Sequence, residues 1–282
     1  MIVSIIQKTG YTIKKDNVNR PLDFREVTND PRVFNYYKFR PVLINAKIQH
    51  GRIRFLSLSK DINPLVHAVK KGMVAKDPFK EIKQCLKLYY NHVQPKSVYE
   101  WFDLNKNDAP QLNQIPVFAA PDPWKISDIQ QKKRSMEISS SKESKRYGAP
   151  LSIDHGDKLF GPVTGAKLDV EAKRLYDVYW SIKENGWLRN DSIDGDIEAI
   201  IFIDNDDWRW QVSRGLHRSV VLSALEWSEI PIRVTKLVYR CDAAIWPNVL
   251  SGMYTKTGAL KRFDKIFKGS PPLLFNTWNK LK

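Results

Sequence analysis

The hydrophobic pattern between residues 169 and 239 changes its period repeatedly, and this succession limits the possible folds more than any other feature of the chain. Apolar side chains recur every three or four residues in two segments and alternate or run continuously in three others. The expected elements are, in chain order, a helix at 169–187, strands at 197–204 and 208–215, a helix at 219–227 and a strand at 230–239. This order predicts a mixed α+β fold.

The joint between the second strand and the second helix has the sequence GLHRS. A helix N-terminus offers unpaired N–H groups and the positive end of the helix dipole. A glycine lets the backbone approach a ligand, and an arginine can hold a phosphate with two hydrogen bonds. Gly215, His217, Arg218 and Ser219 are therefore candidate phosphate-binding residues. A purely structural strand-to-helix turn is the alternative interpretation.

Residues from about 160 to 240 resemble the ParB/sulfiredoxin fold in their "SI…G" helix, their GLHR turn and the following "IPIRV" strand. The resemblance implies that the turn binds nucleotide phosphates, as in DNA-segregation CTPases, sulfiredoxins and free-serine kinases. Leu216 stands where sulfiredoxins carry a cysteine, and His217 stands where segregation proteins carry an arginine. Residues 241–282 show no convincing helix-turn-helix pattern, and the turn most resembles the kinase branch, which uses a histidine-and-arginine turn.

A second, looser resemblance involves "FGPV" before the first helix and "WPNV…SG" after the last strand. These stretches look like ParB-like proteins encoded with bacterial surface-polysaccharide enzymes. The resemblance implies an acceptor of glycan or glycolipid type.

Phosphoryl transfer needs a carboxylate to take the hydroxyl proton or hold Mg²⁺. The kinase branch places its acid near the first helix, where this chain has Asp169 and Glu171, and Glu171 is the first choice. His217 of the turn is the third candidate for a catalytic role. Asp169 also fits an N-cap, and helix capping or dipole compensation is the alternative role for both acids.

Four further side chains are candidate ligand contacts. Arg174 and Ser181 stand seven residues apart, two turns along one face of the first helix. They match positions where sulfiredoxin-like members place a basic and a hydroxyl nucleotide contact. Trp246 and Tyr254 lie near turns and are candidates for substrate contact by stacking.

The organisation along the chain predicts four regions. They are a basic α+β region at 1–125, an exposed linker or mobile loop at 126–150, a ParB/sulfiredoxin-like domain at 151–245 and a helical tail at 246–282. In the first region we expect a strand at 1–8, a hairpin within 42–58 and helices at 63–72 and 78–93.

Charge is concentrated at the amino-terminal end of the chain. Residues 1–150 hold 27 Lys and Arg against 14 Asp and Glu, whereas residues 151–282 hold 19 against 17. Such a surface attracts an anionic glycan, an anionic membrane surface or DNA, and a purely solubilising role is the alternative. Two isolated cysteines and the absence of a long apolar run favour a cytoplasmic protein, with peripheral attachment to the inner membrane left open.

The leading expectation is a kinase that uses ATP or CTP with Mg²⁺ to phosphorylate a hydroxyl of a glycan, glycolipid or small molecule. The alternative is a ParB-like DNA-binding protein or a nucleotide-gated switch without kinase activity.

Overall fold

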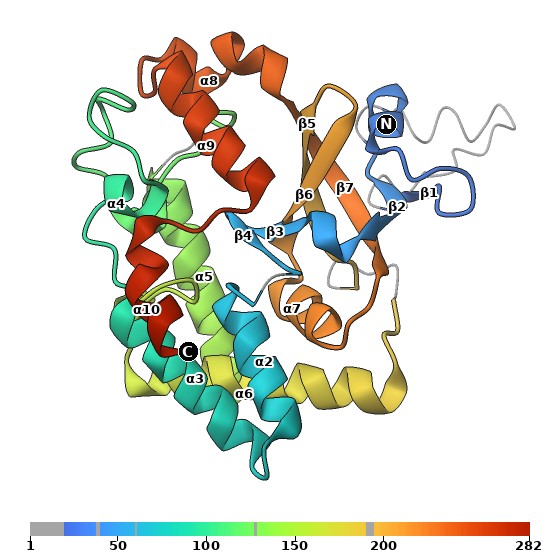
Figure 1. The fold of residues 1–282 in the computed structure, drawn as a ribbon, viewed down its shortest axis with the longest axis vertical. Coiled ribbons are helices and arrows are strands. Elements are labelled where there is room, and N and C mark those ends of the chain that lie inside the picture. Colours follow the sequence, from blue (N-terminus) through green and yellow to red (C-terminus); the bar gives the residue numbers. More distant parts are fainter. Residues whose placement is uncertain (1–19, 38–39, 60, 127–128, 190–194) are drawn as a thin grey trace, which may run out of the picture.

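The computed structural model describes residues 20–37, 40–59, 61–126, 129–189 and 195–282. Within them, a seven-stranded mixed sheet lies against several helices (Figure 1). The strands are β1 (Leu22–Asp23), β2 (Val42–Lys47), β3 (Gly51–Ile53), β4 (Leu56–Ser57), β5 (Glu198–Asp204), β6 (Asp207–Arg214) and β7 (Glu229–Tyr239). The α+β expectation is therefore confirmed, and the strand expected at residues 1–8 lies outside the described residues.

The strands follow the order β1-β2-β7-β5-β6-β3-β4 across the sheet. β5 and β6 form the expected antiparallel hairpin, and β7 runs parallel to β5 on its other side. β2 pairs antiparallel with β7, and β3 pairs parallel with β6. Strands from the amino-terminal region thus extend both edges of the β5–β6–β7 unit.

Within residues 42–58 the antiparallel pair is β3 with β4, and not β2 with β3 around QHG as expected. A short 3₁₀ helix (Ile48–His50) separates β2 from β3, and they then diverge to opposite sides of the sheet. Gly51 is the first residue of β3 and lies beneath the Trp210 ring. A Cβ added to Gly51 would lie 2.6 Å from Cζ2 of Trp210. Each strand finds a longer partner elsewhere, so the local apolar pattern predicted the strands but not their neighbours.

The regions expected at 1–125 and 151–245 share this sheet, and their apolar side chains join one core. Val42 lies opposite Val234, and Gly51 lies opposite Trp210. The two regions are therefore parts of one structural unit, because neither set of strands has its full hydrogen bonding without the other.

The helices surround the sheet, with α7 below the strands in Figure 1 and α8 and α9 at the upper left. Their bounds are α2 (Pro64–Val74), α3 (Pro78–His92), α4 (Val98–Phe102), α5 (Ile129–Tyr147), α6 (Gly165–Asn185), α7 (Leu216–Ala224), α8 (Pro247–Leu250), α9 (Lys256–Lys268) and α10 (Asn276–Leu281). Shorter 3₁₀ helices include Pro31–Tyr36, Val117–Ala119, Ile153–His155, Arg240–Ile245 and Leu273–Phe275. No helix in the described ranges is long and apolar enough to cross a lipid bilayer.

α6 starts earlier than the sequence pattern indicates. Thr164 is the N-cap, with its hydroxyl accepting a hydrogen bond from the Lys167 amide, so Asp169 is not the cap as expected. Gly186 ends the helix with φ of 68°, as predicted from its position. The four extra residues place Asp169 and Glu171 in the second turn of the helix.

The stretch expected as a linker at 126–150 is largely the helix α5, which corrects that expectation. Its Gln, Lys, Arg, Glu and Met residues are good helix formers even though they supply no apolar face. The helix is fixed by polar contacts instead, because Glu143 is its one buried side chain and Lys132 donates to the Ala120 carbonyl.

Candidate functional site

The packing of α6 against α7 brings two candidate residues into direct contact. His217 Nε2 lies 2.8 Å from Glu171 Oε2, although the residues are 46 positions apart. Glu171 is on the buried face of α6 together with Leu168 and Leu175, and His217 is in the first turn of α7. Both side chains are buried, with exposed fractions of 1% for Glu171 and 7% for His217.

Two cations and a second carboxylate complete this group, which we call the Glu171 cluster (Glu143, Lys167, Glu171, Arg174 and His217). Lys167 Nζ lies 2.9 Å from Glu171 Oε1 and 2.6 Å from Glu143 Oε2. Arg174 Nη1 lies 2.5 Å from Glu143 Oε1 and 3.6 Å from Glu171 Oε1. Because two cations face two carboxylates, the charges inside the cluster balance.

Sequence reasoning singled out Glu171, Arg174 and His217 but missed the other two members. Lys167 stands four residues before Glu171, a spacing that places both on one helical face and could have identified it. Glu143 lies in a polar segment without periodicity, so no sequence signal marks it.

The protonation states follow from the surroundings of the central pair. Burial alone would raise the pKa of the Glu171 carboxyl, but the His217 hydrogen bond and the charges of Lys167 and Arg174 hold it well below its usual range. Burial lowers the pKa of His217, and Glu171 only partly offsets this effect. Glu171 is therefore ionised and His217 neutral near pH 7. A neutral imidazole donates to this carboxylate through Nε2–H, which leaves its lone pair on Nδ1.

The turn before α7 leaves the helix N-terminus without a side-chain cap. Gly215 is the N-cap, with φ of 85°. A Cβ at this position would lie 3.0 Å from Ile197 Cγ1, so glycine is required by both the backbone and the space available. The amides of the first turn of α7 are thus not covered by a side-chain cap.

Arg218 and Ser219 have intramolecular roles in this structure. Arg218 Nη1 and Nη2 donate to the carbonyls of Gly195 and Asp196, at 2.9 and 3.0 Å, and so hold the segment before β5. The buried Ser219 hydroxyl donates to the Leu216 carbonyl in its own helix. Phosphate binding by either side chain, as expected from the sequence, would require these bonds to break.

The other two predicted residues on α6 do not join the Glu171 cluster. Asp169 is on the exposed side of the helix and forms an ion pair with Lys83 of α3. Ser181 is exposed two turns beyond Arg174, and its carbonyl accepts a hydrogen bond from Asn185. Only Glu171 of the two acid candidates therefore lies beside the turn.

Trp246 and Tyr254, expected to contact substrate, are core residues in this structure. Trp246 is 5% exposed and lies between Trp124 and Phe263, with ring centroids 5.4 and 5.9 Å away. Tyr254 is 1% exposed and donates its hydroxyl to the Pro121 carbonyl. Substrate could reach these rings only if the core opened.

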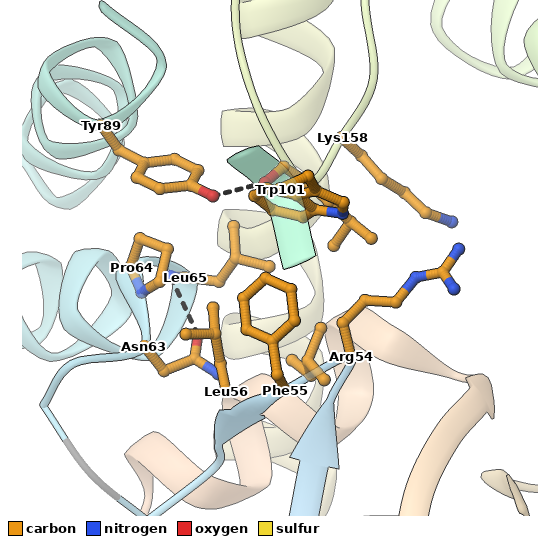
Figure 2. A pocket seen from close by; sticks show the side chains of 11 residues that line it. Arg54, Phe55, Leu56, Asn63, Pro64, Leu65, Tyr89, Trp101 and Lys158 are labelled. Carbon is orange, nitrogen blue, oxygen red and sulfur yellow. Dashed lines mark hydrogen bonds between the residues drawn. The ribbon is translucent and has the colours of Figure 1, made fainter. Parts of the chain in front are cut away.

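A small pocket lies between the β3–β4 turn and α3. Its apolar walls include Phe55, Tyr89 and Trp101, and it encloses about 10 Å³, space for about one water molecule. Figure 2 shows Arg54 and Lys158 at one side of this pocket, with their charged ends extended in the same direction. The charge of Lys158 also contributes to the low pKa of His217, which places this rim within electrostatic reach of the Glu171 cluster.

Among the described residues, no group of three or more His, Cys, Asp and Glu side chains is arranged to hold a metal ion. Glu143 and Glu171 are already paired with Lys167 and Arg174. The Glu171 cluster therefore does not fit a protein-held Mg²⁺ ion, which prefers uncompensated oxygen ligands.

Comparison with models of known protein families, with curated proteins and with solved structures found no match for this chain.

Proposed function

We propose that the chain is a nucleotide-dependent phosphotransferase whose active site is formed by the Glu171 cluster and the amino-terminal end of α7. The observation that carries this proposal is the 2.8 Å contact between Glu171 and His217. Glu171 and Arg174 are expected from the family resemblance and His217 from the GLHRS turn, and the three residues stand at separate positions in the sequence. Their convergence at one uncapped helix terminus supports a common role.

In this proposal His217 is the general base and Glu171 is its positioning residue. The ionised Glu171 holds the Nε2–H tautomer, so Nδ1 accepts the proton of the acceptor hydroxyl. The hydroxyl oxygen attacks the γ-phosphorus, the bond from this phosphorus to the β,γ-bridging oxygen breaks, and the nucleoside diphosphate leaves. Burial keeps His217 neutral, as a base must be at the start of the reaction.

Lys167, Arg174 and the uncapped amides of α7 supply the positive charge that phosphoryl transfer requires. Glu143 occupies both cations, so bound phosphates would have to compete with its carboxylate. Arg174 is the accessible member of the cation pair, since 24% of its side chain is exposed against 8% for Lys167.

The ParB/sulfiredoxin-like assignment belongs to this proposal as well. It is supported by the succession α6, β5, β6, α7 and β7, in which the GLHR turn joins a strand to a helix. Mg²⁺ is assigned no step here, because the cluster lacks free carboxylates for it. The acceptor is a hydroxyl of a glycan, glycolipid or small molecule.

The proposal is tested by thermal shift with ATP, ADP, CTP and GTP, each with and without Mg²⁺, followed by acceptor-dependent nucleotide turnover. We expect one nucleotide to stabilise the protein, and Arg174→Gln to weaken its binding about tenfold or more because a charged contact is lost. The matched control is Lys173→Gln, whose side chain is exposed on the same helix and paired with Asp177.

Failure of every nucleotide to stabilise the wild-type protein would refute the proposal. Duplex DNA binding that weakens steeply with salt, without nucleotide turnover, would favour the ParB-like DNA-binding alternative instead.

A further inference from the structure

A second group of cations surrounds Asp122, in the segment before α5. Arg54 Nη1 lies 3.7 Å from one carboxylate oxygen, and Arg262 Nη2 lies 3.4 Å from the other. Lys132 of α5 is within electrostatic reach of all three residues. We call Arg54, Asp122, Lys132 and Arg262 the Asp122 cluster, and none of its members belongs to the Glu171 cluster.

Arg262 is fully buried but incompletely bonded. Its guanidinium carbon lies 4.0 Å from the centre of the Phe102 ring, and its Nη2 reaches Asp122. Its Nε and Nη1 atoms have no hydrogen-bond partner in the described part of the chain. Unpaired N–H groups on a buried charge are costly, so a further acceptor at this position would stabilise the cluster.

Lys132 shows the same excess of positive charge. Burial and the charge of Arg54 together lower the pKa of Lys132 to about 8, although Asp122 acts in the opposite direction. Among the described residues, Asp122 is the carboxylate that pairs with Arg54 and Arg262. Within the described ranges, three cations therefore share one carboxylate, and two positive charges have no acidic partner there.

The cluster can be reached from solvent through Arg54. This side chain is 30% exposed, and it stands at the β3–β4 turn with φ of 57°, a conformation that non-glycine residues rarely adopt. Its charged end extends beside that of Lys158 at the edge of the small pocket (Figure 2). Because the pocket itself holds about one water molecule, a ligand would lie at this charged rim and not inside the apolar space.

We propose that Arg54, Lys132 and Arg262 form an anion-binding site for the phosphate group of a small molecule. A phosphate monoester carries about −1.5 to −2 charges near pH 7, which matches the two uncompensated cations better than a single carboxylate does. Arginines bind its oxygens with paired N–H donors, which Arg54 offers at the exposed rim, and the buried Arg262 adds positive charge behind Asp122. The site does not depend on the phosphotransfer proposal, since it uses different residues.

Isothermal titration calorimetry of the full chain with inorganic phosphate and with pyrophosphate tests the site. We expect wild-type binding at pH 7, and a loss of about tenfold or more in affinity for Arg54→Gln and for Lys132→Gln. Lys133→Gln, at the neighbouring exposed position of α5, should bind as the wild type does. Arg54→Lys keeps the positive charge and should retain most of the affinity for phosphate and pyrophosphate. Its comparison with Arg54→Gln distinguishes loss of the binding site from loss of the fold.

A titration at pH 8 adds a second readout. The pKa of Lys132 is about 8 in the free protein, and a bound anion would raise it. Phosphate binding should therefore take up protons at pH 8 in the wild type and take up fewer in Lys132→Gln. Calorimetry in buffers of different ionisation enthalpy measures this uptake.

Two comparisons separate this site from the proposed active site and identify the source of the phosphate. Pyrophosphate binding that disappears in Lys167→Gln but persists in Arg54→Gln would overturn the inference and leave the phosphotransfer proposal standing. Binding that depends on Arg54 in a protein without nucleotide turnover would support the site and count against that proposal. If saturating ATP does not displace pyrophosphate, the site binds the phosphate of a second ligand. If ATP does displace pyrophosphate and Arg54→Gln lowers the affinity for ATP, the site binds a phosphate of the nucleotide. No phosphate or pyrophosphate binding by the wild type would refute the inference.

Discussion

At the scale of single residues, the central feature is an ionised glutamate beside a neutral histidine in a buried site. The family resemblance predicted Glu171 and the GLHRS turn predicted His217, as separate candidates, and the structure places them 2.8 Å apart. Lys167 and Arg174 keep Glu171 ionised despite its burial. The same burial withdraws Ser219, Trp246 and Tyr254 from solvent, because their side chains complete the core.

The low pKa of His217 predicts that the protein loses stability in mild acid. The folded state disfavours the protonated imidazole, whereas an unfolded histidine protonates near pH 6.5. The unfolded state therefore binds more protons as pH falls below about 6.5, and the free energy of unfolding decreases until the lower folded-state pKa is passed. Urea unfolding at pH 7.5, 6.0 and 5.0 measures the slope.

His217→Asn removes this titration and should show a smaller decrease between pH 7.5 and 5.0. His155→Asn is the control, because that half-buried side chain lies outside the cluster and bonds to Ser152 in its own 3₁₀ turn. An identical pH dependence for wild type and His217→Asn would show that the histidine is not held neutral by burial.

At the scale of secondary-structure elements, α5 is the part that sequence reasoning misjudged. Its composition resembles an exposed linker, yet it forms 19 residues of helix from Ile129 to Tyr147. Without an apolar face, the helix depends on Glu143 for its attachment to α6. By contrast α2, α3 and the strands β5, β6 and β7 matched their apolar patterns closely, because buried faces impose a clear periodicity.

Substitution of Glu143 should release α5 without unfolding the molecule. Glu143→Gln removes the charge that bridges Lys167 and Arg174, so we expect amide hydrogen exchange along α5 to increase by about tenfold or more. Glu137→Gln, at an exposed position of the same helix, should leave exchange unchanged. Equal protection in both variants would mean that other contacts hold the helix.

At the scale of the whole molecule, a single sheet contains strands from two regions, 1–125 and 151–245, that the sequence suggested were separate. Val42 pairs with Val234 and Gly51 pairs with Trp210, so segments of the basic amino-terminal region complete the sheet of the carboxy-terminal half. The excess of positive charge therefore does not belong to a separate domain. The Asp122 cluster illustrates this, since it joins Arg54 from the turn after β3 with Arg262 from α9.

We predict that residues 126–282 alone do not fold cooperatively. Removal of β2 and β3 would expose the edges of β7 and β6 and the apolar side chains that pack on them. Thermal unfolding followed by circular dichroism, with the full chain as the control, tests this. A sharp transition and dispersed amide resonances for the fragment would contradict the shared-core interpretation.

The resemblance to the ParB/sulfiredoxin fold pointed to Glu171 and Arg174, whereas the sequence pattern by itself determined the elements of the carboxy-terminal half and the turn at Gly215. It could do so because apolar periodicity and glycine conformation are local properties. Only the tertiary structure decided that β2 and β3 lie apart, that Glu143 closes the ion cluster and that three cations converge on Asp122. Apart from Lys132, which follows Asp122 by ten positions, these features depend on pairings between residues more than 20 positions apart, for which a single sequence carries no periodic signal.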